Sequence, residues 1–225
     1  MRPVSLVIAS LVSLALLLPS APANACGNAV YEVQGFMVSA MKKAEKFLEA
    51  GKLRQAINTV RHFKKAEEGS KRRRSRSRRR VKKGGFPSLK AFLQKRDRLI
   101  ELAIVRSAGK WNEKGRRLSA KKRQANLDKA ALKLVETSYE RKEPTSLSPK
   151  ERAMAAEALA VRQGGQQRAL ELLRQLHKEE LMPTAWGYNT LARLESSQGN
   201  QTAGDDAFAQ CKRMASKPKR VCFRD

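Results

Sequence analysis

The sequence predicts an all-α protein in which helical hairpins stack as a short α-solenoid. Three observations predict this fold. In most segments after residue 36, apolar residues recur every three or four positions, which places them on one face of a helix. Glycine or proline stands between these segments, where the chain turns from one helix into the next. No segment alternates apolar and polar residues over the length of a strand, so we expect no sheet.

The first hairpin is expected within residues 37–67. Its first helix, 37–50, carries apolar residues at the helical period. Gly51 ends this helix, because glycine readily takes the left-handed conformation that follows a helix. The second helix runs from 53 to about 67 and buries the apolar side of the pair.

Later helices follow the same pattern of apolar faces and breaks. Ser148 and Glu151 predict a helix start, since Ser can cap the first turn and Glu three residues later can complete a capping box. The stretch 110–123 is basic and is expected to form a turn with at most a short helical piece. We expect helices at 87–108, 124–141, 149–163, 166–180, 184–197 and 202–215.

The segment 1–25 has the pattern of a secretory signal peptide. Arg2 supplies the positive start, an apolar run from Val4 to Leu18 follows, and Ala23 and Ala25 form a small-x-small cleavage site. The apolar run is shorter than the roughly 20 residues of a membrane-spanning helix. Cleavage before Cys26 predicts an exported protein of the periplasm or cell envelope.

Three cysteines bear on this compartment. Cys26 would be first in the mature chain, so lipidation there is an alternative, although Ala23 replaces the Leu that lipoprotein signals usually carry. Thiols outside the cytoplasm tend to oxidise. Cys211 and Cys222 lie close together with Pro218 between them, where it could turn the chain back, and we expect them to form a disulfide. A bridge from Cys26 to one of them is the alternative.

The charge of the protein is strongly positive. Its 225 residues carry a formal net charge of +27, which favours anionic partners. The run 70–83 holds ten Lys or Arg, and we expect a disordered loop that could contact polyanions. Without the signal and this run the chain still carries +16. The arginines expected to contact a polyanion are Arg72, Arg73, Arg74, Arg76, Arg78, Arg79 and Arg80.

The predicted hairpins resemble the tetratricopeptide-repeat family, in which small residues lie where helices cross and glycine lies in the turns. The first hairpin matches the pattern best, the pair at 150–182 departs from it at Gln166 and Glu157, and the last pair has Gly204 where Ala is usual. The resemblance covers about half of the mature chain, and another all-α bundle stays an alternative. It implies repeat-packing roles for Ala44, Phe47, Gly51, Ala56, Gly164, Ala169 and Gly199.

These features divide the chain into consecutive regions. The signal peptide, the basic loop and three helical regions follow one another, and a short tail ends the chain. Their expected bounds are 1–25 for the signal, 26–69 for the N-terminal helical pair, 70–85 for the basic loop, 86–147 for the middle helices, 148–216 for the C-terminal pairs and 217–225 for the tail.

The sequence contains no motif that indicates catalysis. Phosphate-loop, dinucleotide-binding, zinc-protease and Cys-x-x-Cys motifs are all absent, so we expect no catalytic residue, no metal and no cofactor. His62 and His177 suit structural roles on helices. Trp111 among cations could stack on single-stranded nucleic acid, but we expect it, like Trp186, to pack between helices.

The functional expectation is therefore a non-enzymatic exported scaffold. The resemblance implies that it binds another protein along a concave face of the solenoid, with no small-molecule substrate. The alternative is an exported protein that binds nucleic acid, lipopolysaccharide or another acidic polymer through the basic loop, which could also approach an anionic membrane surface.

Overall fold

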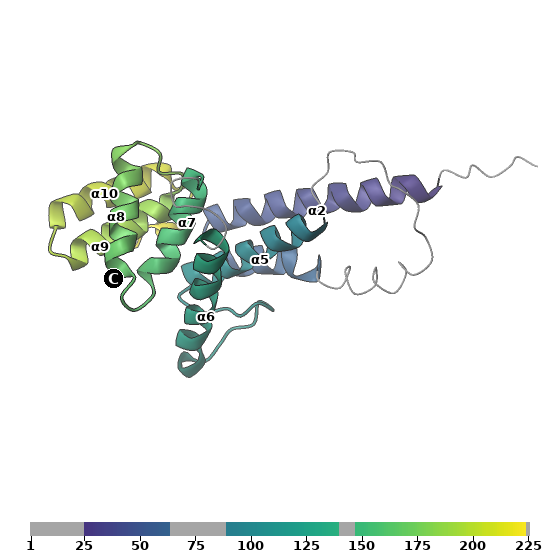
Figure 1. Ribbon diagram of the computed structural model, residues 1–225, viewed down its shortest axis with the longest axis horizontal. Coiled ribbons are helices and arrows are strands. Elements are labelled where there is room, and N and C mark those ends of the chain that lie inside the picture. The colour runs from purple at the N-terminus through teal and green to yellow at the C-terminus, as the bar shows by residue number, and fades with distance from the viewer. Residues whose placement is uncertain (1–24, 64–88, 140–146, 224–225) are drawn as a thin grey trace, which may run out of the picture. The chain divides into compact units, whose positions relative to one another are not determined.

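The computed structural model describes residues 25–63, 89–139 and 147–223 (Figure 1). The chain divides into two units, Met1–Phe36 and Met37–Asp225. In the first unit the structure describes only helical backbone from residue 25 onward and the exposed residues at 35 and 36. The predicted signal peptide falls almost entirely outside the described residues, as does the predicted basic loop 70–85. All that follows concerns the second unit.

The described residues are helical, and the prediction of an all-α protein is confirmed. They contain no strand, and one isolated bridge joins Trp111 to Arg117 in the turn after α5. The elements are α2 (Ala25–Glu49), α3 (Leu53–Val60), the 3-10 turn η2 (Arg61–Phe63), α5 (Leu89–Arg106), α6 (Ala120–Tyr139), α7 (Pro149–Ala160), α8 (Gln166–Lys178), α9 (Ala185–Ser197), α10 (Gln201–Met214) and α11 (Pro218–Val221).

Several boundaries differ from the prediction. The first helix, expected to begin at residue 37, begins at Ala25, and the tail expected from residue 217 contains the short helix α11. Helix α6 begins at Ala120 instead of residue 124, because Lys121, Lys122 and Arg123, none of which is buried, are good helix formers and need no apolar face to continue the helix. The helix expected over 53–67 gives way to the 3-10 turn at Arg61, and residues 64–67 lie outside the described part.

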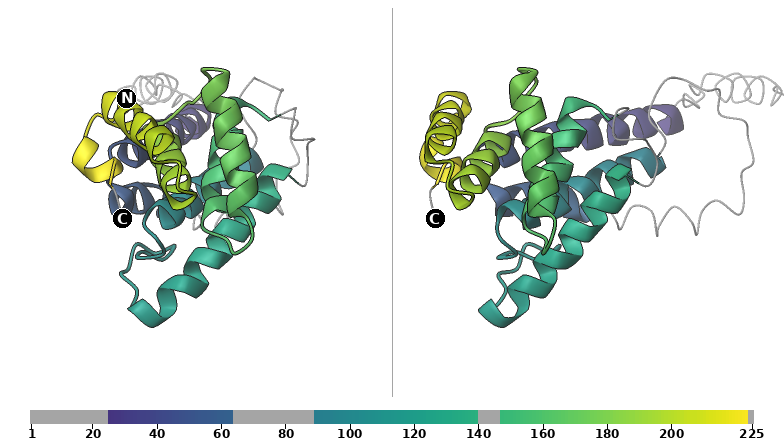
Figure 2. Two further views of the ribbon diagram at one scale, coloured as in Figure 1. Left: turned by 90° about the vertical axis from the view of Figure 1, so that its left-hand side faces the viewer. Right: turned by 60° about the vertical axis from the view of Figure 1, so that its left-hand side comes forward.

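The helices pack in adjacent pairs (Figure 2). Helix α5 packs on α6, α7 on α8 and α9 on α10, while α6 also contacts α7, and α7 contacts α9. Two apolar clusters result. The first joins α3, α5, α6 and the part of α2 from Met37 onward, and the second joins helices α7 to α11. Of the described helices, none has both the length and the apolar character needed to cross a membrane.

Glycines occupy the turns between paired helices. Gly51, Gly164 and Gly199 all have positive φ angles, of 68°, 73° and 83°, which favour glycine over any residue with a side chain. Gly51 is required for a second reason. A Cβ there would lie 2.8 Å from the Cβ of Arg220, so the C-terminal segment packs directly against this turn.

The alanines and the phenylalanine that the resemblance singles out lie at helix contacts, whereas Gly164 and Gly199 are exposed in their turns. Ala44, Ala56 and Ala169 are fully buried, and Phe47 is half-buried against the first cluster. Gly204 also has a physical reason, because a Cβ there would lie 2.5 Å from the Ser196 Oγ across the α9–α10 contact. The Ala192 carbonyl oxygen would also lie 3.1 Å from that Cβ, so the backbones of α9 and α10 approach closely at this glycine.

Local capping interactions fix two helix starts. The predicted capping box is present at α7, where the Glu151 N–H donates to Ser148 Oγ and the Ser148 N–H donates to the Glu151 carboxylate. Thr184 caps α9 by accepting a hydrogen bond from the Gly187 N–H over 3.1 Å.

Buried carboxylates join neighbouring helices. Arg174 on α8 donates two hydrogen bonds of 2.6 Å to Glu195 on α9, and these bonds hold the pKa of Glu195 below its usual range. Glu101 on α5 is less well paired. Its nearest cation is the Lys133 Nζ at 3.5 Å, and burial raises its pKa to about 7.

Ala56→Asp should destabilise the protein strongly. Ala56 is 1% exposed at the contact of α3 with its neighbours, so an aspartate there would be a buried and unpaired carboxylate. We expect a loss of about 3 kcal/mol of unfolding free energy, measured by urea denaturation. Gln55→Asp, one residue away but exposed, should change it little. Equal effects of the two substitutions would contradict the observed packing of α3.

Glu101→Gln should remove a pH dependence of stability. Because the folded pKa lies above the unfolded value, the native state binds the proton more tightly, so wild-type stability should fall as the pH rises through about 7. The fall should be on the order of 2 kcal/mol between about pH 5 and pH 8. Urea denaturation of both proteins at the two pH values measures it, and an identical pH dependence would show that Glu101 is not its source.

Candidate ligand-binding cleft

An open cleft of about 660 Å³ lies where the ends of several helices meet. Its walls come from the α2–α3 turn, the first turn of α3, the end of α5 with the turn after it, the start of α9 and the C-terminal segment. The volume is in the range of small-ligand sites. Its lining residues are Gly51, Lys52, Leu53, Arg54, Gln55, Arg106, Ser107, Ala108, Lys110, Trp111, Trp186, Arg220 and Phe223.

The cleft is cationic. Five lining residues are Lys or Arg, and none is Asp or Glu. Arg106 is neutralised by a carboxylate behind the wall. Within the described ranges, the other four cations, Lys52, Arg54, Lys110 and Arg220, form no ion pair within 4 Å. Their combined field attracts anions into the cleft.

Arg106 forms the best-ordered charge contact of the wall. Its Nε donates to Glu157 Oε2 over 2.7 Å and its Nη2 donates to Glu157 Oε1 over 2.9 Å. Both side chains are nearly fully buried, at 2% and 3% exposure. The remaining nitrogen, Nη1, is also buried and has no hydrogen-bond partner in the described part of the chain. Because Nη1 is itself buried, it is enclosed in the wall and is not exposed to a ligand in the cleft.

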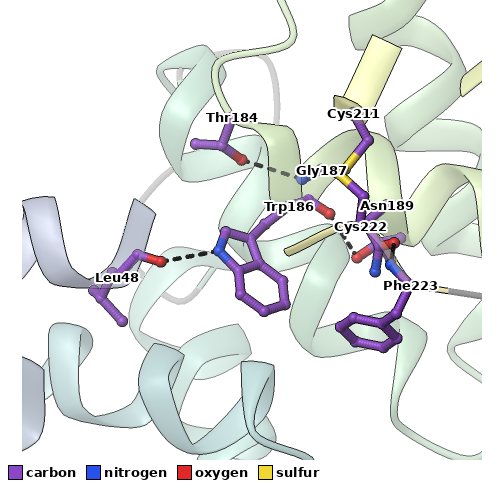
Figure 3. The surroundings of a disulfide bond; sticks show 9 residues. Leu48, Thr184, Trp186, Gly187, Asn189, Cys211, Cys222 and Phe223 are labelled. Carbon is purple, nitrogen blue, oxygen red and sulfur yellow. Dashed lines mark hydrogen bonds between the residues drawn. A yellow bond between two sulfur atoms is a disulfide. The ribbon is translucent and has the colours of Figure 1, made fainter. Parts of the chain in front are cut away.

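Trp186 connects the start of α9 to the end of α2. Its indole N–H donates to the Leu48 carbonyl over 2.9 Å, as Figure 3 shows. The Arg106 guanidinium carbon lies 5.2 Å from the Trp186 ring centroid, within the range of a cation–π contact. Trp186 is 3% exposed, so it supports the cleft from behind and leaves little of its own surface for a ligand.

The C-terminal segment closes one side of the cleft. Cys211 on α10 and Cys222 form a disulfide, with a sulfur–sulfur distance of 2.00 Å (Figure 3). Asn189 Oδ1 accepts a hydrogen bond from the Phe223 N–H over 3.1 Å, and the Phe223 ring contacts Trp186 edge-to-face at 6.2 Å. Arg220 lies against Gly51. Together these contacts bring Arg220 and Phe223 into the lining of the cleft, which also contains Gly51.

Helix α3 points its N-terminus at the cleft. The first three helical residues, Leu53, Arg54 and Gln55, all line it. Their N–H groups have no acceptor within the helix, and the N-cap residue Lys52 supplies no side-chain hydrogen bond to them. The positive end of the helix dipole adds to the charge of the surrounding cations.

The predicted site residues have different positions relative to this cleft. Arg72 to Arg80 and Ala23 fall outside the described residues, and Ala25 and Cys26 lie at the start of the α2 backbone. His62 is exposed beside Arg61, and the His177 ring contacts Tyr188 edge-to-face at 5.6 Å, so neither reaches the cleft.

Sequence reasoning found Trp111 and Trp186 but missed the cations that surround them. Lys52, Arg54, Arg106 and Arg220 are spread over most of the chain, so no local pattern marks them as one group. Trp111 within a basic stretch was the one usable signal. In the structure the Arg54 guanidinium carbon lies 5.2 Å from its ring centroid, and the ring also packs against the first apolar cluster.

The cleft offers groups that bind anions. It has no His, Asp, Glu or Cys in its lining, and the Ser107 hydroxyl already donates to the Ile104 carbonyl. Among the residues that the structure describes, no cluster of three or more His, Cys, Asp or Glu could hold a metal ion. Comparison with known proteins adds no assignment: no protein-family model, curated protein or solved structure matches this chain.

Replacing both cysteines of the disulfide with serine should release the C-terminal side of the cleft. The bridge closes a loop with a sequence separation of 11 residues, and its loss should cost roughly 3 kcal/mol of unfolding free energy. Hydrogen exchange should increase at Val221 and Phe223 but not in α5. An exchange pattern unchanged at Val221 would mean that the Asn189 bond and the Gly51 contact hold the segment without the disulfide.

Proposed function

We propose that this protein is a non-enzymatic scaffold of stacked helical hairpins that binds another protein outside the cytoplasm. The cationic cleft is the observation that carries the proposal. It is large, open and formed by side chains from five separate segments that fixed contacts hold together. Its lining can recognise negative charge and apolar surface, which are the chemistry of a binding site.

The cleft gives a different location for the partner contact than the resemblance does. The tetratricopeptide resemblance implies a concave helix face. The cleft lies instead at helix ends, between the α2–α3 turn and the C-terminal segment. We place the partner contact there because Lys52, Arg54, Lys110 and Arg220 gather around one hollow and, among the described residues, have no ion-pair partner.

Export is supported by two independent features. The segment 1–25 has the order of a signal peptide, with a charged start, an apolar run and a small-x-small site. The Cys211–Cys222 disulfide suits an oxidising compartment. The proposed location is the periplasm or cell envelope, with lipid attachment at Cys26 as the alternative to a soluble mature form.

A second candidate function is polyanion binding through the basic run 70–83. The specific observation in its favour is the density of charge in that run, which holds ten Lys or Arg and no Asp or Glu. In that case the basic run, rather than the cleft, would supply most of the affinity, and binding would depend steeply on salt.

Affinity capture with charge-reversed variants separates the two functions. In the cleft variant, Lys110→Glu with Arg220→Glu, both changed side chains are exposed lining residues. The matched control, Lys42→Glu with Lys121→Glu, makes the same change in net charge at exposed positions away from the cleft. A third variant lacks 70–83. Each serves as bait for envelope extract of the source cell.

The proposed function predicts that wild type, control and deletion variant retain the same partner and that the cleft variant loses it. Polyanion binding predicts instead that the variant without 70–83 loses its partner. The slope of log affinity against log salt of this deletion variant should be flatter than that of wild type by about 4–5, if half of the ten cations contact phosphates. Capture by the cleft variant at wild-type level would reject the cleft as the partner site.

A further inference from the structure

We propose that the cleft binds an acidic peptide segment that carries an aromatic or bulky apolar side chain next to its carboxylates. This inference rests on the proposed function and specifies the chemistry of the partner. It requires that the cleft hold both anion-binding groups and apolar surface, and that these groups suit a peptide better than a nucleic acid.

Two independent features of the cleft call for a negative charge. The cations Lys52, Arg54, Lys110 and Arg220 gather without any carboxylate in the lining. The first turn of α3 presents N–H groups that its N-cap residue does not satisfy. Carboxylates of a ligand would supply the missing acceptors, since arginine and free backbone N–H groups both bind them well.

Apolar surface lies directly beside these charges. Phe223 is 38% exposed although it is large and aromatic, and Leu53 and Trp111, which also line the cleft, are partly buried. An apolar side chain that packs against Phe223 would remove it from water. The ligand is therefore expected to alternate or juxtapose carboxylates with at least one aromatic or bulky apolar residue.

The aromatic rings favour a peptide over single-stranded nucleic acid. Stacking of bases needs an open ring face. The Arg54 guanidinium lies over one side of Trp111, and the ring packs against the core as well. Trp186 is buried beneath Arg106. The third ring, Phe223, has the Arg193 guanidinium carbon 5.9 Å from its centroid and Trp186 at its edge. Of these three rings only Phe223 is more than a third exposed, so the cleft can pack one apolar side chain but does not offer the several open rings on which successive bases stack.

The test measures binding of defined peptides to the full protein by fluorescence anisotropy. The probe is a short labelled peptide of glutamates around one phenylalanine. One comparison peptide replaces the phenylalanine with alanine, and another replaces the glutamates with glutamine. A single-stranded oligodeoxynucleotide of equal charge is the fourth ligand. All are measured at about 0.15 M salt, where long-range attraction to the remaining basic surface is screened.

The inference predicts that the glutamate–phenylalanine probe binds and that either peptide replacement weakens it about tenfold. The Lys110→Glu, Arg220→Glu variant should lose at least as much, while the Lys42→Glu, Lys121→Glu control keeps wild-type affinity. Thermal melting checks that both variants fold. The basic run 70–83 is present in all of them, so its contribution cancels.

Three results would overturn the inference. Equal affinity for the phenylalanine and alanine peptides would remove the apolar requirement. Tighter binding of the oligonucleotide that the cleft variant abolishes would assign the cleft to nucleic acid. If the captured partner depends on the cleft while every acidic peptide fails to compete with it, the proposed function stands and only this inference fails.

Discussion

The buried ion pair between Arg106 and Glu157 is the interaction on which the cleft depends. A carboxylate and a guanidinium that leave water lose hydration, and only good geometry and mutual hydrogen bonding offset that loss. Here two short parallel hydrogen bonds supply that geometry. The pair joins α5 of the first apolar cluster to α7, whose residues contribute to both clusters. Trp186 packs on the same guanidinium and brings in α9.

From this pair the rest of the cleft follows in short steps. Trp186 is fixed by its cation–π contact and by its hydrogen bond to Leu48, so the end of α2 and the turn at Gly51 are fixed relative to α9. The C-terminal segment is then held against Gly51 by the disulfide and by the Asn189 bond. Each contact joins segments far apart in sequence, which explains how cations from across the chain come to surround one hollow.

The sequence predicted the helices well because the interactions that start, continue and end a helix are local. Apolar period, turn glycines and the Ser148–Glu151 cap each act within a few residues, and the structure has them where the sequence placed them. The cleft could not be predicted in this way. Glu157 stood out only as a departure from the repeat pattern, and its partner Arg106 lies 51 residues earlier. Gln166 departed from the pattern in the same way, so nothing in the sequence marked Glu157 as buried or paired it with Arg106.

The central claim is that Arg106 and Glu157 act as one unit that holds the two apolar clusters and the cleft in place. A double-mutant cycle with Arg106→Met, Glu157→Leu and both changes together, measured by urea denaturation, tests it most directly. The account predicts that each single change costs about 3–5 kcal/mol, because it leaves one buried charge unpaired, and that the double change costs much less than their sum. Additive losses from the two single changes would contradict it.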